Sequence, residues 1–502
     1  MERICKIRVL DEVYVAFIGL TGEDIKYFHN KYSAFAANYF FNPKFKLGRW
    51  DGKIHFFEEN GRTFLYFLED IIPQIVARGY TLQLDDLRTS NLKTPELVHA
   101  DTFSYVINPK DGNPVKLRYY QIDSVNELLT QGYGIIQAAT GSGKTLKTAA
   151  LVNAWGNVGH KTITIVPDGT LVSQTKATYT MCGLDVGEYS GTEKTLEHQH
   201  IVSTWQALQN NPNVILQFQV VICDECHGLR GSVLKGLVLD YASSIPHRYG
   251  VTGTLPPEKC DEMAVLSALG PVRYTVTAKQ LIDEGILASV HIDILQLEEN
   301  LTTQYADFCD HPMIGKPPTY TQFKDGYFPD FSSEKSYLQR NTDRIQWIAY
   351  LIMANADKNQ GNTLCLVDSI PFGRQLSKMI PNSIFVNGQD VKKISDRQKV
   401  YKLFEERDDL VVIATVHIAG TGLDIPRVNF MYLIDVGKSA IRVLQGIGRG
   451  LRTAHDKKSV QIVDVTSDLK YSKKHTTART NIYKNAQYPY KKHKIDYTKY
   501  LE

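Results

Sequence analysis

A chain of 502 residues is too long for a single hydrophobic core, so we expect two to four domains. Its 43% hydrophobic and 22% charged residues are typical of a soluble globular protein, and no uncharged apolar run approaches the roughly 18 residues that span a bilayer. Seven scattered cysteines predict a reducing, cytoplasmic setting without disulfides, and the first residues predict no signal peptide.

The formal net charge of +3 hides an asymmetry along the chain. Residues 470–502 carry nine Lys or Arg and two acids, so their net charge is +7 and the remainder sums to −4. A nucleic-acid partner would therefore meet local basic patches and not a globally basic protein.

The first part of the chain, residues 1–88, predicts a small α+β domain with strand-like stretches at 53–59 and 63–70 and a helix ending near residue 80. Within it, "FNPKFKLGRWDGKI" (41–54) interleaves cations with aromatic rings. Cations neutralise phosphates and rings stack on bases, so this stretch is a candidate nucleic-acid surface. The competing interpretation is a basic β-hairpin with its rings in the core. The candidate contacts are Lys44, Lys46, Arg49, Trp50 and Lys53.

Two α/β units follow a polar linker. Near-continuous apolar runs predict buried parallel strands at 134–140, 161–168, 200–206, 220–225 and 249–254, and then again at 363–369, 383–388, 410–416, 430–436 and 460–465. We expect domains at 89–288 and 289–470. The second of them has an irregular insertion at 298–340, which is rich in Pro, Gly and aromatic residues.

"QAATGSGKT" (137–145) follows an expected strand and opens an expected helix, which is the setting of a phosphate-binding loop. Gly141 and Gly143 let backbone N–H groups approach phosphate oxygens. Thr140 precedes the two glycines and Ser142 lies between them, and both belong to the expected loop. Lys144 would reach the outer phosphates of ATP, and the Thr145 hydroxyl would bind Mg²⁺. Ala138 replaces the first glycine of the general pattern, which loosens the match without removing its core.

"VVICDECH" (220–227) places two carboxylates at the end of an apolar strand. Asp224 is suited to hold Mg²⁺ and Glu225 to orient and deprotonate an attacking water. Cys223 and Cys226 offer a competing zinc or redox interpretation. It lacks a second CxxC or a suitably spaced His pair, so we expect no zinc.

"QGIGRGLR" (445–452) carries Arg449 and Arg452 three residues apart, on one face if the segment is helical. Two fixed cations suit the charge that develops on a γ-phosphate, as an arginine finger does. Alone, this spacing favours a solvated helical face or a surface ion-pair network. A phosphate loop and paired carboxylates in the same chain favour the catalytic interpretation.

These segments stand in the order of the superfamily-two helicase motifs, which the chain resembles over roughly residues 110–470. "ATGSGKT", "DECH", "VTGT" (251–254), "ATVHIAGTGLD" (414–424) and "QGIGRGLR" resemble motifs I, II, III, V and VI. "LRYYQ" (117–121) resembles the adenine-recognition element, and "IVPDGTLVSQ" (165–174) and "IVSTWQ" (201–206) resemble motifs that contact nucleic acid. The resemblance implies two tandem RecA-like domains.

The resemblance also assigns roles residue by residue. It implies that Gln121 reads adenine, with Tyr119 or Tyr120 as a stacking neighbour. It also implies ribose and interface contacts by Gly422 and Asp424, and DNA contacts by Pro167, Thr204 and Thr415. Coupling between nucleotide and nucleic acid would involve His227, Thr252, Thr254 and Gln445. ATP and Mg²⁺ would lie between the two RecA-like domains.

Cys226 and His227 after the acidic pair are more similar to the DExH group of DNA translocases than to DEAD-box RNA helicases. The "FNP-basic-aromatic-G-x-WDG" stretch, Phe41 to Gly52, is similar to an element in the phage UvsW helicases. That family implies ATP-driven remodelling of branched DNA, with RNA met in R-loops, by a monomer in the host cytoplasm. An RNA helicase, an ATP-regulated binding module that never unwinds and the motor of a restriction complex stay open as alternatives.

The basic end of the chain, 471–502, has two interpretations. Ile482, Tyr483 and Ala486 are spaced for a helix that packs back on the second α/β domain before Pro489. A disordered DNA-binding arm is the alternative. We expect a docked segment with an exposed cationic face.

Overall fold

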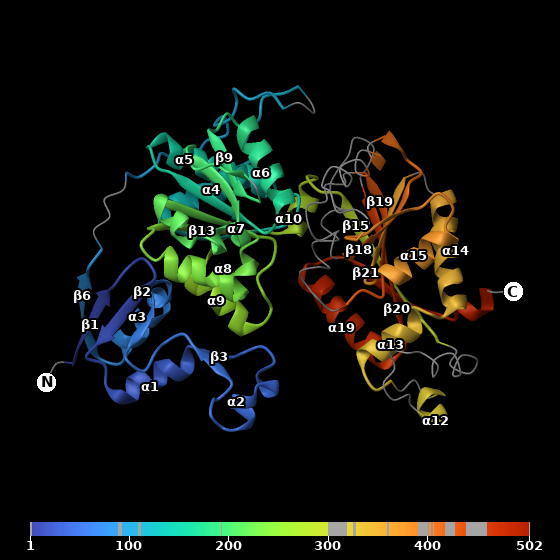
Figure 1. Ribbon diagram of the computed structural model, residues 1–502, viewed down its shortest axis with the longest axis horizontal. Coiled ribbons are helices and arrows are strands. Elements are labelled where there is room, and N and C mark those ends of the chain that lie inside the picture. Colours follow the sequence, from blue (N-terminus) through green and yellow to red (C-terminus); the bar gives the residue numbers. More distant parts are fainter. Residues whose placement is uncertain are drawn as a thin grey trace. The chain divides into compact units, whose positions relative to one another are not determined.

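The structure is a computed structural model that describes residues 3–88, 93–108, 112–191, 193–299, 319–324, 328–358, 361–389, 400, 403–404, 406–416, 427–437 and 459–500. It divides into two compact units, residues 1–276 and 277–502, shown from blue to green and from yellow to red in Figure 1. Each unit is described by itself. Among the described residues, no helix combines the length and the apolar character needed to cross a bilayer.

The first unit begins with a four-stranded sheet in the order β5-β2-β1-β6. Its strands are β1 (Arg3–Val9), β2 (Tyr14–Ile18), β5 (Arg62–Phe64) and β6 (Tyr80–Asp86). Helices α1 (Gly22–Lys31) and α3 (Leu68–Ala77) bury Phe28, Ile71 and Ile75 in the same core as the inward residues of these strands. The Thr21 side chain caps α1 by accepting a hydrogen bond from the Asp24 N–H, which fixes where that helix begins.

A small lobe interrupts this domain between α1 and β5. It contains β3 (Ser33–Phe35) paired antiparallel with β4 (Lys53–His55), and between them the 3₁₀ turn η1 (Tyr39–Phe41) and the short helix α2 (Pro43–Lys46). Figure 1 shows α2 at the lower edge of the unit, away from β1, β2 and β6. We call residues 33–55 the basic lobe.

The second sheet of the first unit has eight strands in the order β10-β9-β11-β8-β12-β13-β7-β14. All neighbours are parallel except β10 and β9. The strands are β7 (Tyr133–Ala138), β8 (Thr162–Val166), β9 (Val186–Ser190), β10 (Glu193–Lys194), β11 (His200–Thr204), β12 (Val220–Asp224), β13 (His247–Thr252) and β14 (Val272–Val276). The helices around it include α4 (Tyr119–Gln131), α5 (Lys144–Asn157), α6 (Gly169–Met181), α7 (Trp205–Gln209), α8 (Ser232–Gly236) and α9 (Lys259–Leu269).

The two sheets of the first unit share side chains across their boundary. Cys260, Met263 and Ala264 of α9 lie in the same hydrophobic core as α1 and α3. The fully buried Arg248 guanidinium, at the start of β13, donates to the Glu12 carbonyl and, at 3.1 Å, to the Tyr66 hydroxyl. The N-terminal sheet is therefore fixed to the sheet that carries the expected phosphate-binding loop and the two carboxylates.

The second unit is built on a seven-stranded, wholly parallel sheet in the order β17-β18-β16-β19-β20-β15-β21. Its strands are β15 (Ser289–Leu297), β16 (Asn362–Val367), β17 (Ile384–Val386), β18 (Val411–Thr415), β19 (Val428–Ile434), β20 (Ser459–Ser467) and β21 (Tyr490–Ile495). The longer described helices are α10 (Ala278–Asp283), α13 (Phe331–Leu338), α14 (Thr342–Lys358), α15 (Ile370–Met379) and α19 (Lys470–Asn485), with the single turn α12 at Tyr320–Lys324 in the expected insertion.

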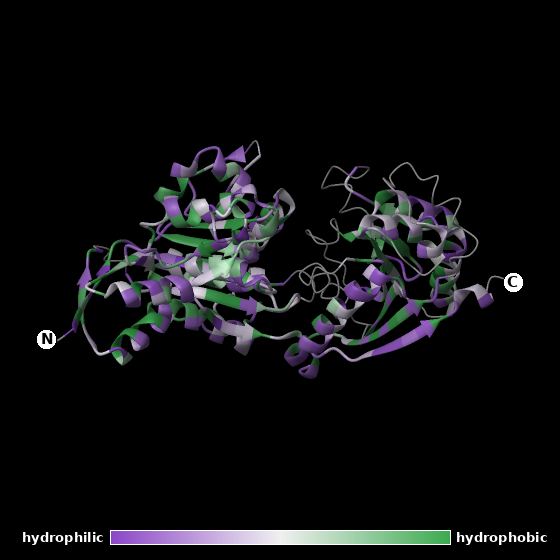
Figure 2. Cartoon of the chain, turned by 90° about the horizontal axis from the view of Figure 1, so that it is seen from below, coloured by the Kyte–Doolittle hydropathy of each residue, from purple (hydrophilic) through white to green (hydrophobic). Residues whose placement is uncertain are grey.

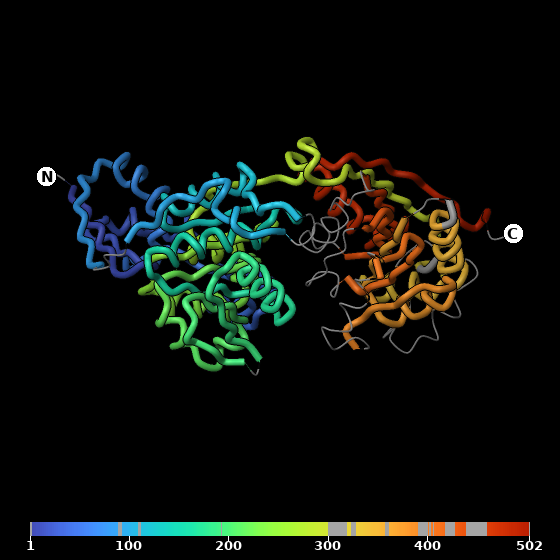
Figure 3. Tube along the Cα trace, turned by 90° about the horizontal axis from the view of Figure 1, so that it is seen from above, coloured from blue at the N-terminus to red at the C-terminus, as the bar shows by residue number. Residues whose placement is uncertain are grey.

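The basic C-terminal segment packs on this unit. Helix α19 buries Arg479 and Tyr483 against Asp464 of β20, and β21 extends the sheet beside β15, as Figure 3 shows. Most side chains of β21 are exposed. The residues of this strand are also hydrophilic, as Figure 2 shows, unlike those of the strands inside the sheet. Its charge therefore stays on the surface.

Every apolar run expected as a strand in the two α/β units is a strand in the structure. The expectation of a strand over 63–70 is wrong beyond Phe64, because the chain enters a 3₁₀ turn at 65–67 and then α3. Leu68, Ile71 and Ile75 recur at helical spacing and face the core, so their burial favours the helix.

Arg248→Ala should lower the free energy of unfolding by about 3 kcal/mol, because it leaves a buried carbonyl and a buried hydroxyl without their charged donor. Urea denaturation measures this change. Arg230→Ala is the matched control, since Arg230 is an exposed arginine of the same unit and its removal should cost less than about 0.5 kcal/mol. Equal effects of the two substitutions would contradict the structural role of Arg248.

Candidate nucleotide and nucleic-acid sites

The expected phosphate-binding loop lies where a parallel strand meets a helix. β7 ends at Ala138 and α5 begins at Lys144, with Thr140 in the turn between them. Gly141 and Gly143 have φ angles of 85° and 77°, in the left-handed region that favours glycine. Gly143 also caps α5, so the turn directs the first N–H groups of that helix toward one point.

Gln121, the expected adenine reader, is tied to this loop. Only 4% of its surface is exposed, its Oε1 accepts from the Arg118 N–H at 2.9 Å, and its Nε2 donates to the Ser142 carbonyl at 3.2 Å. Tyr119 beside it is half exposed, with its ring edge-on to Tyr120. A second lone pair on Oε1 and a second N–H on Nε2 remain with which this amide can read a base.

The paired carboxylates stand opposite Lys144. Asp224 ends β12, and Glu225 follows it at a φ of 48°. The Glu225 N–H donates to Asp224 Oδ1 at 2.9 Å, and Lys144 Nζ lies 3.4 Å from Glu225 Oε1. Strand β12 and the loop after β7 thus bring Lys144 close to two adjacent carboxylates, Asp224 and Glu225, that lie about eighty positions later in the sequence.

Their surroundings shift the pKa values of the two carboxyl groups in opposite directions. Burial, and after it the charge of Glu225, raises the pKa of Asp224 above its usual value. Burial acts on Glu225 as well, but the charges of Lys144 and His227 outweigh it and hold its pKa below the usual value. A divalent cation beside Asp224 would favour its charged form, so the oxygen ligands here fit Mg²⁺.

Thr252 connects the carboxylates to the end of β13. His227 Nδ1 lies 3.1 Å from Thr252 Oγ1 and 3.3 Å from Glu225 Oε2. The Thr252 hydroxyl also lies 3.4 Å from Glu225 Oε2 and 3.1 Å from the Thr254 carbonyl. Glu225 and the three coupling residues expected within the first unit, His227, Thr252 and Thr254, are therefore in one network.

Two further polar groups lie at this site: Ser142, which the sequence analysis placed in the phosphate loop, and Lys147, which it did not. The Ser142 hydroxyl and the Lys147 ammonium are buried and have no hydrogen-bond partner within the described part of the chain. Lys147 lies over the Tyr120 ring at 5.2 Å, and burial, followed by the charge of Lys144, lowers its pKa to about 7. Buried donors without acceptors beside a glycine turn fit a site that receives an anion such as a polyphosphate. The GKT pattern alone gives no weight to a lysine three positions later.

Cys223 and Cys226 are fully buried in the core of the first unit. Burial raises the pKa of the Cys223 thiol to about 12, which disfavours the thiolate that a metal needs. Over the described ranges, no group of three or more His, Cys, Asp or Glu could hold a metal ion. Both side chains pack in the core, Cys223 from β12 and Cys226 from the start of the 3₁₀ turn at 226–230.

Two expected DNA contacts of the first unit lie at one edge of its sheet. Pro167 follows β8 and Thr204 ends β11, and these two strands are neighbours. Gln206 Nε2 donates to the Pro167 carbonyl at 3.3 Å, which ties the two ends together. The Thr204 hydroxyl accepts from the Ala207 N–H as the cap of α7, so its backbone is better placed than its side chain for an outside contact.

In the second unit, Thr415 is the last residue of β18, beside Val367, and is nearly buried. Five other expected residues lie outside the part of the chain that the structure describes, and their roles stay predictions: Gly422, Asp424, Gln445, Arg449 and Arg452.

The five expected contacts of the basic lobe are on its surface or at its base. Lys44, Lys46 and Arg49 are exposed and form no ion pair with any described residue, and Lys53 Nζ lies 5.3 Å from the centre of the Phe35 ring. Trp50 is half-buried, and its indole N–H donates to the Lys53 carbonyl at 2.8 Å. Trp50 therefore holds the turn of the lobe, while the cations stay free to meet phosphates.

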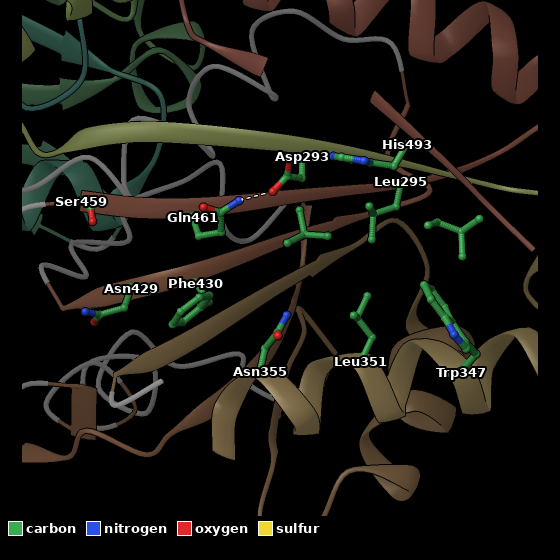
Figure 4. Close-up of a pocket in the computed structure, with 12 residues that line it drawn as sticks. Asp293, Leu295, Trp347, Leu351, Asn355, Asn429, Phe430, Ser459, Gln461 and His493 are labelled. Atoms are coloured by element: carbon green, nitrogen blue, oxygen red, sulfur yellow. Dashed lines mark hydrogen bonds and ion pairs between the residues drawn. The ribbon is translucent and has the colours of Figure 1, made fainter. Parts of the chain in front are cut away.

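A pocket of about 1050 Å³ lies on the second unit, between α14 and strands β15, β19, β20 and β21 (Figure 4). Three of its polar groups are paired with each other: Gln461 Nε2 donates to Asp293 Oδ2 at 2.6 Å, and His493 Nε2 lies 3.1 Å from Asp293 Oδ1. None of the residues expected to carry function lines it.

Three family models match the chain. "DNA helicase UvsW, N-terminal" matches residues 5–85, "Type III restriction enzyme, res subunit" matches 114–257, and "Helicase conserved C-terminal domain" matches 344–454. The helicase models cover parts of both α/β units, so the expected pair of RecA-like domains after a small α+β domain is confirmed.

Among curated relatives, the ATP-dependent DNA helicase uvsW of Enterobacteria phage T4 is 24% identical over 448 residues, which are 85% of this chain and 84% of that protein. The DNA 3'-5' translocase XPB2 of Sulfurisphaera tokodaii is 28% identical over 199 residues, 39% of this chain and 44% of that protein. A solved structure, the ATP-dependent Type ISP restriction-modification enzyme LlaBIII bound to DNA, is similar with a TM-score of 0.54 and 14% identity, over 85% of this chain and 36% of that one. This last likeness concerns the fold alone.

Gly143→Ala should weaken nucleotide binding at least tenfold. An added Cβ would lie 2.3 Å from Gln121 Nε2, and a φ of 77° costs an L-residue about 1–2 kcal/mol. Titration with a fluorescent ATP analogue measures the affinity. Gly169→Ala is the control, because a Cβ there meets nothing within 4 Å. Undiminished affinity of the Gly143 variant would show that the loop does not receive the phosphates.

Proposed function

The chain is a UvsW-like helicase of superfamily two, and on this premise we propose that it uses ATP hydrolysis to remodel branched DNA. It is an ATP-dependent DNA helicase; the branched substrate, in the form of forks and four-way junctions, is the proposal. R-loops, which contain RNA, are a further proposed substrate, and we propose that a monomer acts.

One observation supports the proposal above all others: Lys144 and the two carboxylates converge beside a glycine turn that holds buried, unpartnered donors. We assign Lys144 to the β- and γ-phosphates of ATP, and Thr145 and Asp224 to Mg²⁺. Mg²⁺, when bound, neutralises charge on the phosphate oxygens. Glu225 orients the attacking water and accepts its proton, a role that suits a carboxylate held in its charged form.

When nucleotide occupies the loop, Lys144 exchanges the Glu225 carboxylate for phosphate oxygens. Glu225 then keeps His227 and Thr252 as its neighbours within the first unit. Thr252 ends β13, and Arg248 near the start of the same strand holds the N-terminal domain. A change of partners at the carboxylates can therefore be transmitted along the buried strand β13 to the N-terminal domain, which carries the basic lobe.

The DNA contacts that we propose are of two kinds. The carboxyl ends of β8 and β11, near Pro167 and Thr204, contact a DNA strand while the motor moves. The basic lobe meets phosphates with Lys44, Lys46, Arg49 and Lys53, because a concentrated positive charge attracts the nucleic-acid backbone. A lobe fixed to the motor suits the remodelling of a branch, since the branch must stay in place as the motor advances.

The proposal is tested by comparing ATP hydrolysis in the presence of single-stranded DNA, uninterrupted duplex, four-way junctions and RNA. We expect the largest stimulation with junctions, together with ATP-dependent conversion of a labelled junction into its arms. Stimulation by RNA alone would favour an RNA helicase. Hydrolysis that no nucleic acid stimulates would overturn the proposed function.

Two substitutions separate binding from hydrolysis. Lys144→Ala should abolish both, because it removes the cation at the outer phosphates, whereas Glu225→Gln should leave ATP bound and lower turnover by at least about a hundredfold. Equilibrium binding of a labelled ATP analogue and steady-state hydrolysis measure the two effects. Lys259→Ala, an exposed lysine of the same unit, should change neither. Near-normal turnover in either site variant would refute the assigned roles.

A further inference from the structure

The tip of the basic lobe exposes aromatic rings. Phe40 and Phe41 are 49% and 66% exposed, and their ring centres lie 4.3 Å apart. Leu47 on the same lobe is 66% exposed. A contiguous apolar tip of this kind usually marks a surface that something else covers.

These rings are exposed although the lobe itself is well packed. The Tyr39 ring stacks on Phe35 at 4.5 Å and meets Phe45 edge-on at 4.8 Å, so three half-buried or exposed rings form a small core beneath the tip. Gly52, at a φ of 81°, lets the chain pass this core, because a Cβ there would lie 2.6 Å from the Tyr39 ring. Phe40 and Phe41 are therefore held outward on a defined support.

The lobe is also attached firmly to the motor. Ala34 of β3 lies in the same hydrophobic core as Met263 and Ala264 of α9, which belongs to the first RecA-like domain. A ligand at the tip is thus held at a fixed place relative to the nucleotide loop of the same unit.

Positive charge surrounds the aromatic tip. Residues 41–54 hold four cations, Lys44, Lys46, Arg49 and Lys53, and one acid, Asp51. The Asp51 carboxylate is occupied, since it lies 2.9 Å from His55 Nε2 and accepts from the Lys53 N–H. A partner that offers flat apolar faces bordered by negative charge is complementary to this surface.

We propose that Phe40 and Phe41 form a stacking platform for an exposed base at a DNA branch point, with the surrounding cations on the flanking phosphates. The inference rests on the proposed function and adds how a branch is distinguished from continuous duplex. Inside an uninterrupted duplex every base face is covered by its neighbour, so only the cations find partners there. At a branch, a terminal or unpaired base has a free face, and an aromatic ring can stack on it.

The structure assigns this role to Phe40 and Phe41 and not to Trp50, the ring that the sequence analysis named among the candidate nucleic-acid contacts. Trp50 is half-buried with its N–H bonded inside the lobe, whereas Phe40 and Phe41 have neither burial nor polar atoms to satisfy. The run Tyr39-Phe40-Phe41 is the sequence signal for the platform, because one of three consecutive rings packs inward while the other two stay outside.

The test measures the affinity of the full chain for a four-way junction and for an uninterrupted duplex of equal length, without ATP. Replacing both rings (Phe40→Ala with Phe41→Ala) should weaken junction binding about tenfold, which is ~1.4 kcal/mol, and leave duplex binding unchanged. The dependence of junction affinity on salt should keep its slope, because no phosphate contact is lost. DNA-independent ATP hydrolysis and thermal stability should also be unchanged.

Three comparison variants make the outcome specific. Phe40→Tyr with Phe41→Tyr should restore junction affinity, because both flat faces remain. Leu47→Ala, which removes an equally exposed but non-aromatic side chain, should have little effect. Lys44→Gln with Lys46→Gln should weaken junction and duplex binding alike and lower the salt slope by about 0.9 for each lost contact.

Failure of this inference differs from failure of the proposed function. If hydrolysis by the unaltered chain is stimulated by DNA but the double Phe→Ala variant keeps its junction affinity, or loses duplex affinity equally, the platform is refuted and the helicase assignment stands. An effect of Leu47→Ala as large as that of the double variant, or self-association of the chain that the double variant abolishes, would identify a protein-docking surface instead. A chain that binds no DNA would overturn both proposals.

Discussion

The buried Arg248 guanidinium is the constraint on which the arrangement of the first unit depends. A fully buried arginine is costly to desolvate, and its cost is met here by the Glu12 carbonyl and the Tyr66 hydroxyl of the N-terminal domain. The strand that begins with this contact ends at Thr252, beside the acidic pair. Strand β13 thus connects the N-terminal domain, which carries the basic lobe, to the proposed site of hydrolysis. The N-terminal domain and this site therefore behave as parts of one body.

The nucleotide site shows how a loop meant for an anion is stabilised by the protein's own groups. Lys144 is paired with Glu225, and Gln121 bridges to the Ser142 carbonyl, so two of the groups assigned to ATP have internal partners. Each contact is weak enough to be exchanged, since the ion pair between Lys144 and Glu225 spans 3.4 Å and the hydrogen bond from Gln121 Nε2 to the Ser142 carbonyl spans 3.2 Å. We propose that ATP replaces Glu225 as the partner of Lys144, which leaves the Glu225 carboxylate available for hydrolysis.

The sequence predicts the strands and motifs well because burial on both faces of a parallel sheet leaves continuous apolar runs. It predicts less where tertiary contacts decide. The stretch 63–70 has strand-like composition, yet packing of Ile71 and Ile75 favours a helix from Leu68 onward. β21 has no apolar run and is a strand because β15 offers an edge with which to pair. Which rings of the basic lobe lie inside it, Tyr39 or Phe40, depends on a turn that composition does not reveal.

In the second unit, as in the first, buried arginines hold the end of a strand in place. Arg344 of α14 donates to both Asp435 oxygens at 2.7 Å, and Arg479 of α19 donates to the Val436 carbonyl at 2.6 Å. Asp435 has a φ of 49°, a strained conformation that persists because the charge pair holds it. In a printed sequence such arginines resemble surface charges of a basic protein. Arg344 and Arg479 are therefore structural, whereas the cations of the basic lobe have no such acidic partners among the described residues and are better suited to bind DNA.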